Sequence, residues 1–199
     1  MPGIHAAVVV AIMALVVSAR AVENGRLQSF PSAYNPDKAA VRITAAWVPY
    51  GGLPEIGVPA HELILAISDL VAYPPGASAR ALVSPVKESK LTHLAFDHKI
   101  GTHCTNGSPR WDVETTDESV YAFGCASGVH QVNFPALGWE RITFSCVDVQ
   151  VLTGSAGSCP LGSPQSLSLL QVLQDESGST TLANLNVNHS VMSKPDNTR

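Results

Sequence analysis

The sequence predicts an all-β protein, an antiparallel β-sandwich of jelly-roll type with about eight or nine strands, preceded by a signal peptide helix. Three observations support this fold class. Short stretches alternate between apolar and polar residues with a period of two. Glycine, proline and asparagine signals for turns separate these stretches. After the amino terminus, no stretch carries a convincing pattern for a long helix.

The amino terminus predicts an exported chain. Ala6 to Val17 is an unbroken apolar run, and the small residues Ala19 and Ala21 after it are typical of a signal-peptide cleavage site. The run is shorter than the roughly 20 residues that span a bilayer, so an uncleaved anchor is the weaker alternative. We therefore expect a signal peptide at 1–21, a leader loop at 22–40, one sandwich domain at 41–191 and a frayed tail at 192–199.

The amino-acid composition excludes some classes of binding partner. Hydrophobic residues make up 45% of the 199 residues and charged residues only 14%, against about 25% in an average soluble domain. Lys and Arg number 12 against 16 acidic residues, which does not suit a nucleic-acid binder or an anionic membrane surface. We expect a secreted protein, extracellular or periplasmic, that leaves the membrane once its signal is cleaved. The oligomeric state stays open.

The stretch from Cys104 to Cys125 is typical of a disulfide-closed hairpin. Residues 109–116 alternate, residues 119–125 form a second strand candidate, and a turn near Asp117 separates them. If the two strands pair antiparallel, the cysteines lie near the open end of the ribbon. An exported chain meets oxidising conditions, which favours disulfides.

The other two cysteines, Cys146 and Cys159, are then expected to pair across the next connection, although four cysteines allow three connectivities. A zinc site is the alternative, because His103 and His130 lie close in sequence to the first pair. Structural zinc sites usually contain a C-x2-C pair, which this chain lacks. We therefore predict two disulfides, no metal and no cofactor.

The predicted strands share a period of two or a short apolar run, bounded by turn residues. They cover residues 41–47, 61–73, 79–86, 91–98, 109–116, 119–125, 141–151, 167–174 and 180–187. The stretch 61–73 also fits a helical stripe. We favour a strand there because the rest of the chain is strand-like.

Aromatic residues are the first candidates for ligand binding, because sugar rings stack on flat apolar surfaces. Trp47 and Trp111 fall on the apolar side of their alternation, which favours the core. Trp139 follows a loop rich in proline and glycine and is the better exposed candidate, with Tyr121 as a second. Asn184, Asn186 and Asn188 alternate along the last strand, so their amides are expected on one face, where they would bind a polar ligand or calcium, or simply face water.

No catalytic residue is identified. His61-Glu62 begins like a zinc-protease helix, but Leu65 stands where the second histidine is needed. No G-x-S-x-G nucleophile elbow is present. Glycoside hydrolysis needs two carboxylates about 5 to 10 Å apart, and the sequence alone does not bring any two together. The available carboxylates are Asp97, Asp112, Glu114, Asp117 and Glu140.

The run FDHKIGTHCTNGSPRWDVETTD, followed by VYAFGC, GWERITF and TTLANLNVN, resembles a group of uncharacterised exported bacterial β-sandwich proteins. In that group a G-S-P-R-aromatic-x-V strand and a final T-x-L-x-N-(Leu/Ile)-x-V strand recur. The group resembles jelly-roll carbohydrate-binding modules in layout, which implies a sandwich and no catalytic residue. Ala183 stands where the group often has an aspartate before the residue corresponding to Asn184, which removes a carboxylate from any calcium site carried over.

These observations favour a secreted, non-catalytic β-sandwich that binds an extracellular ligand such as a glycan or a cell-surface polymer. A structural or adhesive surface protein with only protein contacts is the second hypothesis, and a carboxylate-dependent hydrolase is the third. An exposed aromatic row flanked by polar side chains would favour the first. A flat apolar patch would favour the second, and a cleft with two close carboxylates the third.

Overall fold

A computed structural model describes residues 27–35, 41–53, 60–68, 76–86, 89–105, 107–134, 137–154 and 159–192. Within these ranges the chain forms thirteen β-strands joined by turns and short 3-10 segments. The predicted signal peptide at 1–21 and the tail after Met192 lie outside the described residues. No helix in the described part of the chain is long and apolar enough to cross a membrane.

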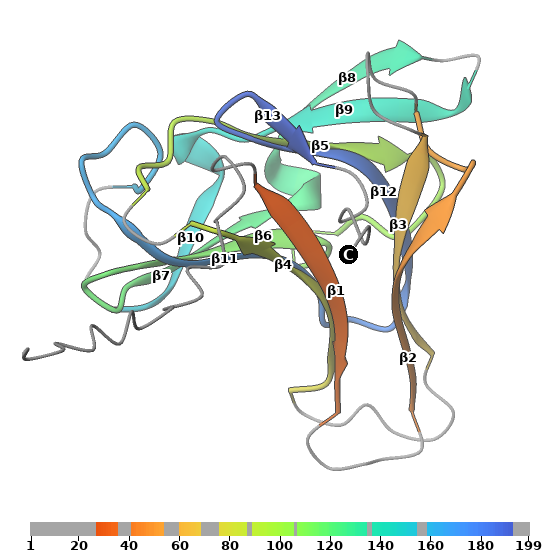
Figure 1. The fold of residues 1–199 in the computed structure, drawn as a ribbon, viewed down its shortest axis with the longest axis horizontal. Coiled ribbons are helices and arrows are strands. Elements are labelled where there is room, and N and C mark those ends of the chain that lie inside the picture. Colours follow the sequence, from red (N-terminus) through yellow and green to blue (C-terminus); the bar gives the residue numbers. More distant parts are fainter. Residues whose placement is uncertain are drawn as a thin grey trace, which may run out of the picture.

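Two antiparallel sheets stack face to face, as Figure 1 shows. The six-stranded sheet has the order β1-β4-β11-β6-β7-β10. Its strands are β1 (Gln28–Tyr34), β4 (Ser78–Ser84), β11 (Leu167–Gln174), β6 (Arg110–Thr115), β7 (Val120–Gly124) and β10 (Val149–Thr153).

The seven-stranded sheet has the order β2-β3-β12-β5-β9-β8, with a short β13 paired to β12. Its strands are β2 (Arg42–Pro49), β3 (His61–Ser68), β12 (Gly178–Val187), β5 (Leu94–Lys99), β9 (Trp139–Thr143), β8 (Val129–Phe134) and β13 (Ser190–Met192). The predicted all-β antiparallel sandwich is therefore confirmed. The stretch from His61 is a strand through Ser68, as favoured over a helix.

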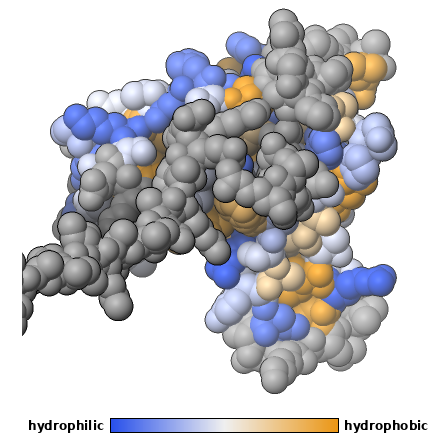
Figure 2. All heavy atoms as spheres, viewed as in Figure 1, coloured by the Kyte–Doolittle hydropathy of each residue, from blue (hydrophilic) through white to orange (hydrophobic). Residues whose placement is uncertain are grey.

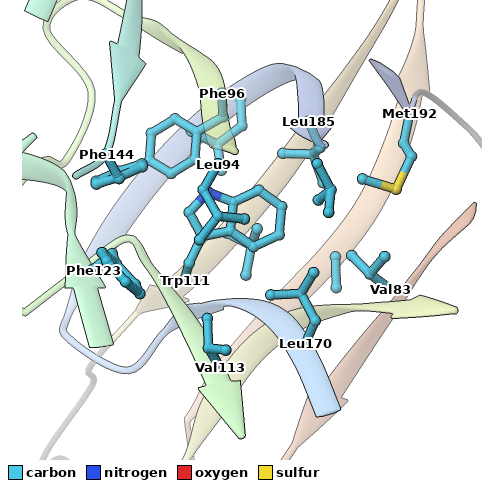
Figure 3. Packing of buried hydrophobic residues seen from close by; sticks show 14 of the residues in the cluster. Val83, Leu94, Phe96, Trp111, Val113, Phe123, Phe144, Leu170, Leu185 and Met192 are labelled. Carbon is cyan, nitrogen blue, oxygen red and sulfur yellow. The ribbon is translucent and has the colours of Figure 1, made fainter. Parts of the chain in front are cut away.

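The core lies between the sheets and is built from every second residue of the central strands. Figure 3 shows Trp111 of β6 beneath Phe96 of β5, with Phe144 and Phe123 beside them. The ring centroids of Phe96 and Phe144 are 5.3 Å apart in an edge-to-face arrangement, which aromatic pairs prefer. Full burial of one such side chain contributes on the order of 2 to 3 kcal/mol to folding.

The predicted hairpin and both predicted disulfides are present. Strands β6 and β7 pair antiparallel, and the turn between them carries Glu118 at a φ of 65°. Cys104 bonds to Cys125 beyond the open end of this ribbon, and Cys146 bonds to Cys159. The first bond ties the segment after β5 to the end of β7, so it links the two sheets.

The predicted leader loop at 22–40 is wrong over residues 28–34, which form β1. Two prolines in this segment, Pro31 and Pro36, favoured a loop. A proline is nevertheless tolerated in an edge strand, and β1 is the edge of the six-stranded sheet. All seven residues of β1 are in register with β4, from Gln28 opposite Ser84 to Tyr34 opposite Ser78.

Two further differences concern the region after Cys125. Residues 129–134 were expected in a loop and form β8, the other edge of the seven-stranded sheet. The single strand expected over 141–151 is two strands, β9 and β10, which belong to different sheets. A 3-10 turn at Cys146–Asp148, capped by Ser145, redirects the chain between the sheets. Apolar alternation continues through this turn, so periodicity did not reveal it.

Removing the Cys104–Cys125 bond is expected to lower the free energy of unfolding by about 3 kcal/mol, because the bond closes a loop with a sequence separation of 21. The measurement is denaturant unfolding of the double variant C104S/C125S. The matched control is C146S/C159S, whose bond closes a separation of 13 and whose loss is expected to cost slightly less. Unchanged stability in C104S/C125S would contradict this structural role.

Candidate ligand-binding face

The two aromatic candidates from the sequence are not exposed. Tyr121 lies in the main core and is fully buried. Trp139 lies on the outer side of the seven-stranded sheet but is only 3% exposed, in a small apolar cluster with Leu53 and Ala183. The Lys99 ammonium lies 5.8 Å from its ring centroid. The expectation that Trp139 is an exposed side chain is therefore wrong.

Asn184, Asn186 and Asn188, expected on one face of the strand over 180–187, have different hydrogen-bond partners in the structure. A bulge in β12 between Ala183 and Asn186 breaks the alternation, and Asn184 has a left-handed φ of 45°. The Asn184 amide donates to Asp97 at 2.8 Å. Asn188 lies in the turn after β12, and its side-chain oxygen accepts from the Thr92 backbone N–H at 2.6 Å. The Asn188 side chain thus binds the backbone of a neighbouring segment, and the Asn184 side chain binds a carboxylate of the next strand.

Asn186 is the remaining member of the set. It pairs with Ala95 in the β-ladder and is buried. Its side-chain oxygen accepts no hydrogen bond from any residue that the structure describes. Asn186 therefore stays a proposed ligand-binding residue, on a central strand of the seven-stranded sheet.

Two of the carboxylates considered for hydrolysis, Asp97 and Glu140, lie on the seven-stranded sheet and form hydrogen bonds with basic side chains. Asp97 is buried, and Arg141 donates to both of its oxygens, at 2.8 and 3.0 Å. Glu140 lies between two histidines, 3.0 Å from a ring nitrogen of His98 and 3.0 Å from one of His130. Burial opposes ionisation of Glu140, but these two hydrogen bonds outweigh burial and lower its pKa. Carboxylates held in this way act as structural ties between strands.

One cluster has the residue types of a metal site. A ring nitrogen of His98 and the sulfurs of Cys104 and Cys125 lie within 4.8 Å of one another. Both sulfurs are joined in the disulfide, so neither is the thiolate that a transition metal requires. In this oxidised state the cluster does not fit a metal.

The outer face of the six-stranded sheet is different, because large apolar side chains face solvent there. Phe30 and Tyr34 of β1 are 43% and 46% exposed. Leu82 of β4 lies opposite Phe30, and Arg80 lies opposite Ser32 between the two rings. We call Phe30, Tyr34, Arg80 and Leu82 the aromatic patch.

Polar side chains continue this face across the sheet. The β-ladder pairs Leu82 with Gln171 of β11, and Gln171 with Asp112 of β6. The neighbouring row runs from Arg80 through Leu173 to Arg110. The aromatic patch therefore lies beside a charged region on the same side of the same sheet.

Arg110 organises that charged region. Its guanidinium donates to Asp112 at 2.7 Å and to Asp175 at 2.6 Å. Burial raises the pKa of Asp112 although Arg110 opposes this shift. Burial also acts on Asp175, but the hydrogen bonds from Arg110 and from the Ser108 hydroxyl lower its pKa. The positive charge of Arg110 is thus compensated within the protein.

Sequence reasoning missed the aromatic patch, because β1 fell in the expected leader loop. A signal was present: in QSFPSAY, the aromatic Phe30 and Tyr34 fall on one side of a period of two and small Ser29 and Ala33 on the other, as in a strand. Pro31 and Pro36 favoured a loop over the strand that this alternation indicates. The contact of Arg110 with Asp175, 65 residues away, had no sequence signal.

The fold and this face define a β-sandwich with an aromatic and charged outer face on one sheet. No protein-family model matches the chain, and no curated protein matches it. A solved structure that it is similar to is the family 11 carbohydrate-binding module of the cellulosomal cellulase Lic26A-Cel5E of Clostridium thermocellum. That match has 7% sequence identity and a TM-score of 0.43, and it covers 87% of this chain and 91% of that chain. At this level of likeness, what that module binds says nothing of what this chain binds.

Trp139→Ala is expected to destabilise the protein, because the ring is buried against Leu53 and Ala183. We expect a loss of about 3 kcal/mol in the free energy of unfolding, measured by denaturant titration. Tyr50→Ala is the matched control, since Tyr50 is 94% exposed and its loss should change stability by less than about 0.5 kcal/mol. Equal stability of Trp139→Ala and wild type would show that the ring is not packed as described.

The stability contributed by Asp175 is expected to depend on pH. Its pKa is lower in the folded than in the unfolded chain, so its contribution is present above the ordinary carboxyl pKa and is lost as pH falls through the folded value. The difference in unfolding free energy between wild type and Asp175→Asn should therefore shrink as pH falls from about 6 to about 2. A difference that stays constant over this range would contradict the Arg110–Asp175 contact.

Proposed function

We propose that this chain is a secreted, non-catalytic β-sandwich that binds a glycan or cell-surface polymer through the aromatic patch. One observation carries the proposal: two half-exposed rings, Phe30 and Tyr34, lie on the same side of one strand. They are four residues apart, so their Cα atoms are separated by about 13 Å along the strand. Large exposed aromatic side chains next to polar groups are typical of a surface that binds a partner.

The surroundings of the two rings suit a polymer of sugars. Sugars offer apolar ring faces for stacking and hydroxyl groups for hydrogen bonding. The aromatic patch supplies the first kind of contact, and the neighbouring Gln171, whose side chain also hydrogen-bonds to Asp112, supplies an amide for the second. A strand of an antiparallel sheet is a rigid support, so little ordering entropy is lost when a ligand binds.

A secreted location belongs to the same proposal. The disulfides Cys104–Cys125 and Cys146–Cys159 fit an oxidising compartment. The apolar run near the amino terminus favours export.

The two other hypotheses have less support. A purely adhesive protein would favour one broad apolar area. On the face seen in Figure 2, the residues drawn in colour include both hydrophobic and hydrophilic ones. A hydrolase would need two carboxylates facing a substrate, but Asp97, Asp112 and Glu140 each pair with a basic side chain. The two other candidates, Glu114 and Asp117, accept hydrogen bonds from the hydroxyls of Ser168 and Thr115.

Phe30→Ala and Tyr34→Ala are each expected to weaken glycan binding about tenfold, a loss of about 1.4 kcal/mol, because each removes one stacking surface. The measurement is affinity electrophoresis of the exported chain in gels containing β-glucan, xylan, polygalacturonate or alginate. Both residues are half-exposed, so the melting temperature should change little.

Tyr50→Ala is the control for this test, because it removes another exposed aromatic ring, outside the aromatic patch. It should migrate like wild type in every gel. Equal retardation of wild type, Phe30→Ala and Tyr34→Ala in a gel that retards wild type would contradict the proposed site. No retardation of wild type in any gel would contradict glycan binding.

A further inference from the structure

We propose that the ligand of the aromatic patch is an anionic glycan, a polymer that carries uronate carboxylates, and that Arg80 binds such a carboxylate. This inference rests on the proposed function and specifies its ligand class. It comes from the position and the charge of one guanidinium group.

Arg80 is held in a defined place on the outer face. It lies on β4, between the edge strand β1 and the central strand β11. Its Nε donates to the Ser32 hydroxyl at 3.3 Å, and its Cζ lies 5.2 Å from the centroid of the Tyr34 ring. A guanidinium over an aromatic ring is stabilised by a cation–π interaction. These two contacts fix the group beside a half-exposed ring before any ligand arrives.

Arg80 differs from Arg110 and Arg141 in how its positive charge is compensated. Arg110, on the same face, contacts Asp112 and Asp175. Arg141, on the other sheet, contacts Asp97. Among the residues that the structure describes, Arg80 forms no ion pair with a carboxylate; its contacts are a neutral hydroxyl and a ring.

A half-buried cation with this geometry suits a carboxylate. The Ser32 contact uses Nε, and among the residues that the structure describes no hydrogen bond to the two terminal nitrogens of Arg80 is found, so these can form a paired hydrogen bond to two carboxylate oxygens. A sugar whose carboxylate binds there lies next to Tyr34 and within reach of the apolar surface of Phe30 and Leu82. A uronate combines both features, an anionic group and a ring with apolar faces, whereas a neutral sugar would leave the positive charge without a partner.

The test compares acidic glycans with matched neutral ones. Polygalacturonate and alginate are each prepared as the free acid and as the methyl ester, which keeps the sugar rings and removes the charge. Affinity electrophoresis of the exported chain at low ionic strength should show retardation by an acid form at least tenfold stronger than by its ester. The preference should weaken as salt is added, because salt screens exposed charges.

Arg80→Gln should abolish the preference for the acid form, so that the acid and the ester retard this variant to the same extent. Arg80→Lys keeps the charge but not the planar fork, so it should restore only part of the preference. Circular dichroism and melting curves confirm that both variants fold.

The outcomes separate the two proposals. If wild type binds neutral glycans through Phe30 and shows no preference for either acid form, or if Arg80→Gln retains the preference, the anionic class is wrong and glycan binding stands. If no acid, ester or neutral glycan retards the chain, both proposals fail.

Discussion

Burial of the apolar layer between the two sheets is the interaction on which the rest of the structure depends. In a strand, successive side chains point to opposite faces, so placing one set in the core places the other set outside. On β1 the buried residue is Ser29, which accepts a hydrogen bond from the Trp47 indole across the sandwich at 3.1 Å. A slip of one residue would bury Phe30 and Tyr34 and expose Ser29. The exposed rings are thus a consequence of the core.

The outer faces of the two sheets differ in how their charges are satisfied. On the seven-stranded sheet, Arg141, Asp97 and Asn184 form a closed network in which the carboxylate is buried and fully partnered. In such a network the hydrogen-bonding capacity of the carboxylate is used within the protein and not by a ligand. On the six-stranded sheet, Arg110 is paired with carboxylates in the same way, whereas the partners of Arg80 within the described part of the chain are a hydroxyl and an aromatic ring. The side chains best placed to bind a ligand therefore lie on β1 and β4.

The elements that depend on residues close in sequence, such as hairpins and turns, were predicted from the sequence. The alternation through Trp111 and the turn at Asp117 indicated the β6–β7 hairpin, and the symmetric placement of Cys104 and Cys125 indicated its disulfide. Elements that depend on tertiary context were missed. β1 and β8 are edge strands, each stabilised by a single neighbour, and β1 contains a proline that only an edge tolerates. Trp139 follows a turn at Gly138, yet Leu53 packs against it from a distant segment.

The central claim is that ligands bind on the outer face of the six-stranded sheet at β1 and β4. Backbone amide NMR of the protein, titrated with short oligosaccharides of a polymer that retards it in the gels, tests this claim most directly. The account predicts shifts concentrated at residues 30–34 and 80–82, with little change at Asp97, Trp139 and Arg141. Shifts concentrated on the seven-stranded sheet, with β1 and β4 unchanged, would contradict it.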